Sequence, residues 1–316
     1  MPQTIQYTME ELQEFIKQDP CSIIALYGGE PLLEIDTVKT ILNTIQAKHF
    51  VINTNGFFLE QLEEYIHRFD TILLSIDGRE TVTDGYRGKG CYKKVMQAVD
   101  FVKKNSYSKE LIARMAVSKK TDIYKDVTHL LSYFPLVHWQ LDVIWSPLWE
   151  LNEFSDWVET SYKPGVLRLL DEWIEHIHNG TIKGIVPFMG IMTRILHGGS
   201  GLACQAGNQA MAITTDGKVL ACPIAPEFEW NVLGDFQKRK TITIGKPCIQ
   251  CSVYDICGGR CLFSYKEQCW GTQGFNAVCK TTQFVINELK QRKKECKQLK
   301  ELFHYPLFNN TTEIIP

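Results

Sequence analysis

The chain has 316 residues, enough for one large domain or for a domain with a smaller module. Hydrophobic residues make up 44% and charged residues 22%, which excludes a disordered chain. No apolar run reaches the roughly 20 residues of a membrane helix, and the N-terminus lacks a secretory signal pattern, so we expect a cytoplasmic protein that does not bind a membrane. The formal net charge of −2 gives no electrostatic reason to expect nucleic acid as a partner.

The first half of the chain predicts alternating strands and helices. Short apolar runs that end at glycine or asparagine indicate buried strands, and helical spacing of apolar residues separates them. In chain order, we expect a helix over 8–16, a strand over 22–27, a helix over 37–48, a strand over 49–53, a helix over 59–68, a strand over 71–76, a helix over 92–104, a strand over 111–117, a helix over 122–133 and a strand over 138–144.

This alternation with short loops predicts an α/β fold with a parallel sheet and right-handed crossovers. The chain enters on a helix, although a parallel unit normally begins with a strand, and only five strands are counted. We therefore expect a partial (β/α) barrel that is missing its first strand.

Polar and glycine-rich residues gather where three of these strands end. They form the segments Gly28-Gly29-Glu30-Pro31, Asn53-Thr54-Asn55-Gly56 and Ser75-Ile76-Asp77-Gly78. In parallel barrels this rim carries the chemistry, because the strand ends and the loops that follow them converge there. We expect the binding site at this rim.

Five tryptophans crowd the stretch that runs from the fifth strand into a predicted helix over 164–178. They are Trp139, Trp145, Trp149, Trp157 and Trp173. Large aromatic side chains mainly supply buried area, so this pattern favours packing in the core over the alternative, the lining of a substrate cavity.

Cysteine is the unusual feature of the composition. The chain has 11 cysteines, and eight of them lie between Cys204 and Cys279. A predicted hairpin over 210–221, turning at Asp216-Gly217, brings the cysteines on its two sides together. Seven of the eight cysteines form the series Cys204, Cys222, Cys248-x2-Cys251-x5-Cys257-x3-Cys261 and Cys279. Without an export signal this series indicates metal ligation rather than disulfides, and by spacing alone both iron–sulfur clusters and structural zinc remain open.

Taken together, these motifs resemble the radical S-adenosylmethionine (AdoMet, SAM) enzymes that carry a C-terminal SPASM domain, with the peptide-modifying SPASM enzymes as the nearest subgroup. The three strand-end segments, Tyr86-Arg87-Gly88 and the seven-cysteine series carry the resemblance, over residues ~20 to ~285. It implies a truncated radical SAM partial barrel over residues 1–185, a small cysteine-rich iron–sulfur SPASM domain over 186–290, and a basic helix with a C-terminal tail over 291–316.

The resemblance implies roles in AdoMet binding for residues at the strand ends. Backbone groups of Gly28, Gly29 and Glu30 would hold the amino group of the methionyl part, where glycine lets the main chain approach the ligand. The pocket would be lined by Asn55, Ser75 and Asp77, with turn bonding as the alternative for the last two. Arg114 would reach the methionyl carboxylate, with a solvated or helix-paired arginine as the alternative.

The resemblance also implies two auxiliary [4Fe–4S] clusters. The first would be held by Cys204, Cys222 and Cys261; the position of a fourth ligand in some relatives is Gly198 here, which leaves one open iron site. Cys269 is the obvious substitute ligand. The second cluster would be held by Cys248, Cys251, Cys257 and Cys279.

One family motif is missing. Radical SAM enzymes carry Cys-x3-Cys-x2-Cys after their first strand, and here Cys21 is isolated, with Cys91 the next cysteine. The motif and the first strand belong to one segment, so their joint absence favours a truncated chain or a misplaced start codon over a degenerate relative.

Two classes of function follow. The first is a radical SAM enzyme that generates a 5′-deoxyadenosyl radical for hydrogen abstraction from a peptide or protein, with an electron donor such as ferredoxin or flavodoxin, and that is incomplete in this chain. The alternative is a non-catalytic iron–sulfur binding or electron-relay relative, or a structural zinc-binding module.

Overall fold

The computed structural model describes residues 4–143 and 149–316. Its first half holds a five-stranded parallel sheet with the order β1-β2-β3-β4-β5. The strands are β1 (Ile23–Leu26), β2 (His49–Thr54), β3 (Thr71–Ser75), β4 (Glu110–Val117) and β5 (Leu136–Leu141). The predicted α/β partial barrel with five strands is confirmed; Ile144, predicted as the end of the last strand, lies outside the described residues.

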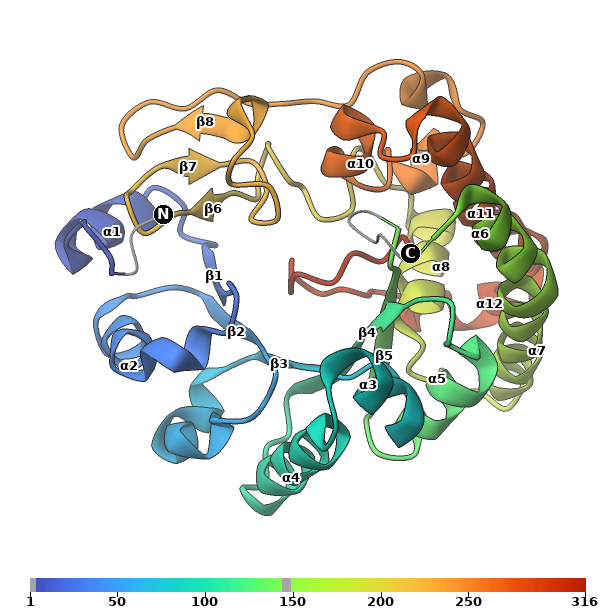
Figure 1. The fold of residues 1–316 in the computed structure, drawn as a ribbon, viewed down its shortest axis with the longest axis horizontal. Coiled ribbons are helices and arrows are strands. Elements are labelled where there is room, and N and C mark those ends of the chain that lie inside the picture. The colour runs from blue at the N-terminus through green and yellow to red at the C-terminus, as the bar shows by residue number, and fades with distance from the viewer. Residues whose placement is uncertain (1–3, 144–148) are drawn as a thin grey trace.

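Helices cover the outside of the curved sheet (Figure 1). They are α1 (Met9–Ile16), α2 (Ile35–Thr44), α3 (Glu80–Arg87), α4 (Cys91–Lys104), α5 (Ile123–Leu131), α6 (Leu151–Trp157), α7 (Lys163–His178) and α8 (Val186–His197), with 3-10 helices η1 (Pro31–Glu34) and η2 (Leu59–Arg68) and the π-helical turn η3 (Val158–Tyr162). Of these, α3, α6 and α8 are not predicted from the sequence. No helix within the described ranges is long and apolar enough to cross a membrane.

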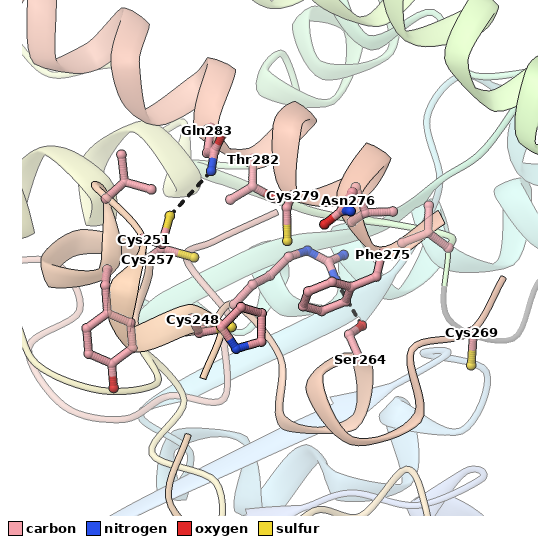
Figure 2. A pocket seen from close by; sticks show the side chains of 17 residues that line it. Cys248, Cys251, Cys257, Ser264, Cys269, Phe275, Asn276, Cys279, Thr282 and Gln283 are labelled. Carbon is pink, nitrogen blue, oxygen red and sulfur yellow. Dashed lines mark hydrogen bonds between the residues drawn. The ribbon is translucent and has the colours of Figure 1, made fainter. Parts of the chain in front are cut away.

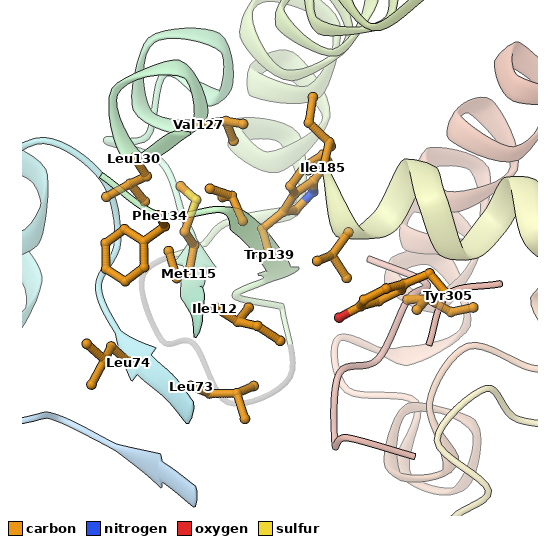
Figure 3. Close-up of a cluster of buried hydrophobic side chains, with 14 of the residues drawn as sticks. Leu73, Leu74, Ile112, Met115, Val127, Leu130, Phe134, Trp139, Ile185 and Tyr305 are labelled. Carbon is orange, nitrogen blue, oxygen red and sulfur yellow. The ribbon is translucent and has the colours of Figure 1, made fainter. Parts of the chain in front are cut away.

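The core contains side chains from both faces of the sheet (Figure 3): Leu74, Met115 and Trp139 lie on the outer face with the helices, and Leu73 and Ile112 lie on the inner face. Trp139 of β5 is fully buried, its indole packs edge-on against Phe188 of α8 with ring centroids 5.7 Å apart, and its Nε1 donates to Tyr162 Oη at 3.0 Å. The predicted core role is confirmed for Trp139, Trp149, Trp157 and Trp173, all of which are buried, whereas Trp145 lies outside the described residues.

The inner face of the sheet is polar and partly accessible toward the carboxyl ends of the strands. Register places Ser75 beside Arg114 on the neighbouring strand, and Ala116 beside Gln140. Several residues on this face are partly or fully exposed: Ala25, Asn53, Ser75, Arg114, Ala116 and Gln140. Nearer the amino ends of the strands the same face carries buried apolar side chains, among them Val51, Leu73 and Ile112. The polar and accessible part of the inner face therefore lies at the carboxyl ends of the strands.

The second half of the described chain is cysteine-rich and has little regular structure. It contains β6 (Ala212–Ile213), β7 (Val219–Leu220), η4 (Glu229–Asn231), β8 (Val232–Gly234), η5 (Cys248–Gln250), α9 (Tyr254–Cys257), α10 (Leu262–Glu267), α11 (Gly271–Gln291), α12 (Lys293–Cys296) and η6 (Lys297–Leu302). The predicted hairpin is confirmed as β6 and β7, with Gly217 at φ +81° in its turn. The small sheet lies beside α1 (Figure 1), where Phe236 packs against Tyr7 and Phe15.

After η6 the chain turns back and enters the middle of the ring of strands (Figure 1). This C-terminal segment, residues 303–316, is largely buried, with Ile314 4% and Ile315 0% exposed. Asn310 Nδ2 donates to Glu110 Oε2 at 2.9 Å, and Asn309 Nδ2 donates to the Cys204 carbonyl at 2.9 Å. The segment therefore joins the barrel to the cysteine-rich half.

Candidate functional site

The loop after β1 carries Gly28 and Gly29, whose need for glycine is not explained by the fold. Neither residue has a positive φ, and a Cβ built on either would meet no atom within 4 Å. Both residues are exposed at the end of the strand. The open space beside this main chain would let a bound molecule approach it closely.

The carboxylate of Glu30 ties this loop to the end of β2. It accepts hydrogen bonds from Thr54 Oγ1 at 2.6 Å, from the Asn55 amide at 2.7 Å and from the Leu32 amide at 3.0 Å. These bonds use the side chain of Glu30 to hold the two strand-end loops together. Its backbone remains at the rim beside the two glycines.

Asn55 and Asn53 have different surroundings at the end of β2. The Asn55 side chain accepts from the Phe57 amide at 2.9 Å and so stabilises its own turn. Asn53 lies on the inner face, and its Oδ1 is buried without a hydrogen-bond partner among the described residues. An unpartnered buried oxygen is costly, so Asn53 is a candidate ligand-binding residue that the sequence analysis missed. The sequence signal was its place in the strand, where a polar residue between Ile52 and Thr54 points to the opposite face of the sheet from both.

Asp77 is 2% exposed, and its carboxylate is already occupied by the protein. Arg87 of α3 donates to it from Nε at 2.6 Å and from Nη2 at 2.7 Å, and the Ala116 amide donates at 2.9 Å. The structure therefore gives Asp77 a bracing role between β3, α3 and β4. Ser75, two residues earlier at the end of β3, keeps part of its surface exposed on the inner face.

Arg114 projects from β4 to the inner face and faces a carboxylate. Its Nη2 lies 3.5 Å from Glu313 Oε2, and its guanidinium lies 5.9 Å from the ring centroid of Tyr27. Burial opposes the charged form of this arginine, but the Glu313 carboxylate and the Tyr27 hydroxyl outweigh burial and raise its pKa. Arg114 therefore pairs with a carboxylate of the chain itself on the inner face, and its role in ligand binding stays a prediction.

Five cysteines line one cavity of about 160 Å³ in the cysteine-rich half, and four of them lie together. These four are Cys248, Cys251, Cys257 and Cys279, brought together by η5, α9 and α11 (Figure 2). Burial, with the neighbouring thiols, raises the pKa of Cys279 to about 12 and that of Cys248 to about 11. Four thiols around one cavity suit a cationic iron–sulfur core, which would hold its ligands as thiolates.

A second group of thiols lies near the barrel. Burial raises the pKa of Cys204 and of Cys222 to about 12, and the charges of Cys261 and Glu313 add to both shifts. Cys222 also contributes to the raised pKa of Tyr27, whose first cause is burial. The structure thus brings Cys204, Cys222 and Cys261 together beside the loop that follows β1. Three thiols of this kind fit a cluster with one open position.

Two buried arginines lie among these thiols. Arg260 is 5% exposed, its Nη2 has no hydrogen-bond partner among the described residues, and its charge lowers the pKa of Cys257 and Cys279 against the larger effect of burial. Arg194 is 9% exposed, and Cys257 and Cys204 both favour its charged form. Buried cations at both thiol groups fit an anionic occupant, which a thiolate-ligated cluster is.

Cys269 lines the edge of the four-cysteine cavity but lies apart from the other sulfurs (Figure 2). Burial raises its pKa, followed by the charge of Glu267, and Cys261 is the weakest cause. It stays a candidate substitute ligand. Among the described residues, no three histidine, cysteine or acidic side chains converge closely enough for a single metal ion.

Comparisons with known proteins agree with this geometry. Residues 2–122 match the family model described as the radical SAM superfamily. The structure of anSMEcpe with bound AdoMet superposes with a TM-score of 0.69 at 16% identity, covering 93% of this chain and 90% of that one. Its complex with AdoMet and the Cp18Cys peptide gives 0.70 at 16% identity and the same coverage.

Streptococcus suis SuiB bound to precursor peptide SuiA gives a TM-score of 0.53 at 13% identity, covering 82% of this chain and 66% of that one. No curated protein matches the chain. At these identities the likeness establishes the fold, and the fold is shared over almost the whole chain.

Proposed function

We propose that the chain is a radical SAM protein of the SPASM type and that it binds AdoMet, two auxiliary [4Fe–4S] clusters and a peptide substrate. AdoMet, cleaved reductively at a cluster, supplies the 5′-deoxyadenosyl radical for hydrogen abstraction in this family. Ferredoxin or flavodoxin is the proposed class of electron donor. The domain division at 185 and 290 is part of the proposal.

The observation that carries the proposal is the cavity lined by Cys248, Cys251, Cys257 and Cys279. Its cysteines come from segments up to 31 residues apart in sequence (248 to 279), and the fold brings them to one place. The anSMEcpe structures with this fold contain bound AdoMet, and structures of anSMEcpe and of SuiB contain bound peptides. These findings support a cluster- and AdoMet-dependent role over a purely structural one.

At the AdoMet site the chain's own residues would bind and orient the molecule. The backbone of Gly28, Gly29 and Glu30 would hold the amino group, where the absence of Cβ atoms leaves room. Arg114 would pair with the methionyl carboxylate, and its present contact with Glu313 supports the role of a carboxylate receptor. Polar side chains that would complete the pocket are Asn53, Asn55 and Ser75, with Asp77 bracing the rim.

In the cysteine-rich half, thiolates would hold both clusters. Cys248, Cys251, Cys257 and Cys279 would hold one, and Cys204, Cys222 and Cys261 the other, which leaves one iron of that cluster open. Arg260 and Arg194 would offset the negative charge. Gln283, whose Nε2 lies 3.3 Å from Cys251 Sγ, would donate to a ligating sulfur.

Iron and sulfide counts on anaerobically reconstituted protein test this proposal. We expect about eight irons and eight sulfides per chain for two clusters of four. Cys279→Ser should lose about four irons, because it removes one of four ligands from a closed set. The matched variant Cys21→Ser, which changes an exposed thiol outside both groups, should keep all of them. Colourless protein, or protein that carries only zinc, would contradict the proposal.

A second candidate, a cluster-bearing electron-relay or binding protein that does not cleave AdoMet, is favoured by one observation. The 316 residues contain no Cys-x3-Cys-x2-Cys. For this chain by itself we therefore expect AdoMet binding without formation of 5′-deoxyadenosine when dithionite is added. Chromatographic detection of appreciable 5′-deoxyadenosine would exclude the second candidate.

A further inference from the structure

The inner side of β5 already holds a peptide segment, the chain's own residues 313–316. We propose that this is the binding site for the substrate peptide, and that the C-terminal segment occupies it until a peptide replaces it. The ligand class is a peptide with an aliphatic side chain at the position of Ile314. This inference rests on the proposed function and specifies where and how the peptide would bind.

Main-chain carbonyls of the segment are bound by side chains of the barrel. Gln140 Nε2 donates to the Glu313 carbonyl at 2.7 Å and to the Ile315 carbonyl at 3.0 Å, and His138 Nε2 lies 3.0 Å from the Glu313 carbonyl. His138 and Gln140 are two positions apart on β5, so both side chains reach the same face. Contacts of this kind recognise a peptide main chain of any sequence.

The cysteine-rich half binds the next carbonyl of the segment. Arg260 Nε donates to the Pro316 carbonyl at 3.1 Å, and Thr282 Oγ1 of α11 donates to it at 3.2 Å. Arg260 and Thr282 both line the four-cysteine cavity as well. A peptide held in this register would therefore run from the barrel toward the proposed second cluster.

One glycine makes room for the aliphatic side chain. A Cβ on Gly190 of α8 would lie 2.3 Å from Ile314 Cγ2 and 2.5 Å from Ile314 Cβ, far inside contact distance. Gly190 has no positive φ, and glycine costs stability inside a helix, so the fold gives no other reason for it. The space above Gly190 is a side-chain pocket that accepts a branched aliphatic residue.

Glu313 is the feature that separates the chain's own segment from a substrate. Its carboxylate faces Arg114, the residue proposed to hold the AdoMet carboxylate. A peptide with an uncharged residue at this position would keep the carbonyl and aliphatic contacts and leave Arg114 free for AdoMet. The substrate class is therefore a peptide with an uncharged residue followed by a branched aliphatic one.

The test uses a reconstituted chain that ends at Thr312, so that the site is vacated while the rest of the segment stays anchored. The probe is a fluorescein-labelled hexapeptide, Thr-Thr-Gln-Ile-Ile-Pro, which has glutamine at the place of Glu313, with binding followed by fluorescence anisotropy. We expect the shortened chain to bind it roughly tenfold more tightly than the full chain, whose site is occupied. Equal binding by the two folded chains would overturn the inference.

Gly190→Ala in the shortened chain is the decisive variant. It should weaken binding roughly tenfold or more, because the added methyl group takes the space of the aliphatic side chain. Its matched control is Gly85→Ala in α3, where a Cβ would meet only Lys120 Nζ at 3.8 Å. Equal affinity in the two glycine variants would overturn the proposed pocket.

A full-length variant keeps the test valid if the shortened chain does not fold. Glu313→Arg places two like charges side by side at Arg114 and should release the C-terminal segment. Limited proteolysis would then cleave the released segment beyond residue 306. The released protein should also bind the peptide, and adding Gly190→Ala should abolish that binding. Release without such binding would overturn the inference. Bound iron and bound AdoMet are measured on the same sample. Protein that contains iron and AdoMet but does not bind the peptide would contradict this inference alone. Protein that binds the peptide but contains no iron would contradict the proposed function alone.

Discussion

At the residue scale, Arg114 is the point where the fold, the proposed AdoMet site and the C-terminal segment meet. Its partner in the structure is Glu313, at 3.5 Å. If AdoMet binds through the same guanidinium, the Glu313 carboxylate competes with it. Glu313→Gln should therefore strengthen AdoMet binding roughly three- to tenfold, since a partly buried charged contact contributes on the order of 1 kcal/mol. Calorimetric titration of reconstituted protein measures the change.

The control for this prediction is Glu153→Gln. Glu153 pairs with Lys119 at 3.0 Å, with both side chains largely exposed and outside the AdoMet site. It should leave the AdoMet dissociation constant unchanged. Unchanged or weaker AdoMet binding by the Glu313 variant would show that Arg114 does not receive the methionyl carboxylate.

His138 predicts how stability depends on pH. Burial lowers its pKa from 6.5 to about 4, with the charges of Glu313 and Arg114 acting in opposite directions. The imidazole therefore binds a proton more readily in the unfolded chain than in the folded one. The stability that depends on neutral His138 is complete above about pH 6.5 and is lost as the pH falls toward 4. The loss is about 3 kcal/mol in the free energy of unfolding. Urea unfolding from pH 7 to 4 measures it.

His138→Gln is the comparison, because glutamine donates to the Glu313 carbonyl but does not titrate. The free energy of unfolding of this variant should fall less steeply over the same pH range, and the difference from the unchanged protein is the contribution of His138. Carboxylates titrate in both proteins and cancel in the difference. Parallel curves for the two proteins would refute the neutral, buried state of His138.

The sequence named most residues of the candidate site, but it did not show which contacts each of them makes. The resemblance to a known family named Gly28 and Gly29, and the clustering and spacing of the seven cysteines indicated metal ligation. Asp77 was predicted at the rim, yet its carboxylate pairs with Arg87, a partner ten positions away on a helix that was not predicted. Asn53 was passed over because only the completed sheet shows that its Oδ1 has no partner among the described residues.

At the scale of elements, the Asp77–Arg87 pair fixes α3 to the ends of β3 and β4. Removing the guanidinium would leave the carboxylate of Asp77 buried with the Ala116 amide as its remaining donor. Arg87→Gln should therefore lower the free energy of unfolding by about 3 kcal/mol. In contrast, Lys17→Gln, which breaks an exposed pair with Glu14, should change it by less than about 0.5 kcal/mol. Equal effects in denaturant titrations would refute the bracing role.

The elements that sequence predicted best are those with a clear periodic pattern. The five strands are short apolar runs between turn residues, and each is found within a few residues of its predicted bounds. α8 was missed because Val186–His197 is buried on several sides and so lacks a polar face. α3 was missed for the opposite reason, since Glu80–Arg87 is mostly polar and buries only Val82 and Thr83.

At the scale of the whole molecule, the C-terminal segment has no local pattern that would reveal its place. Its contacts join residues far apart in sequence, such as Asn310 with Glu110 and Glu313 with Gln140. The segment is a linear stretch of mixed polar and apolar residues, and only the completed ring of strands gives it a binding surface. This is why sequence analysis predicted the two halves of the chain but not the part that connects them.

The two halves should respond differently to the loss of iron. The barrel has a large continuous core, whereas the cysteine-rich half has a small one, of which Leu202, Val219 and Leu262 are members. Without a cluster its buried thiols are neutral at pH 7, since their pKa values reach about 12 at Cys204 and Cys279, and they would line an empty cavity. Cluster binding and folding of this half are then coupled.

Hydrogen exchange with and without an iron chelator measures this coupling. Chelation should raise amide exchange over residues 204–270 by roughly a hundredfold and leave β2, β3 and β4 protected, because local stability follows local packing. The small sheet β6-β7-β8 is the sensitive reporter, since its strands are only two or three residues long. A uniform rise across both halves would mean that the barrel and the cysteine-rich half unfold as one unit, and no rise would mean that thiols and cavity hold this half without metal.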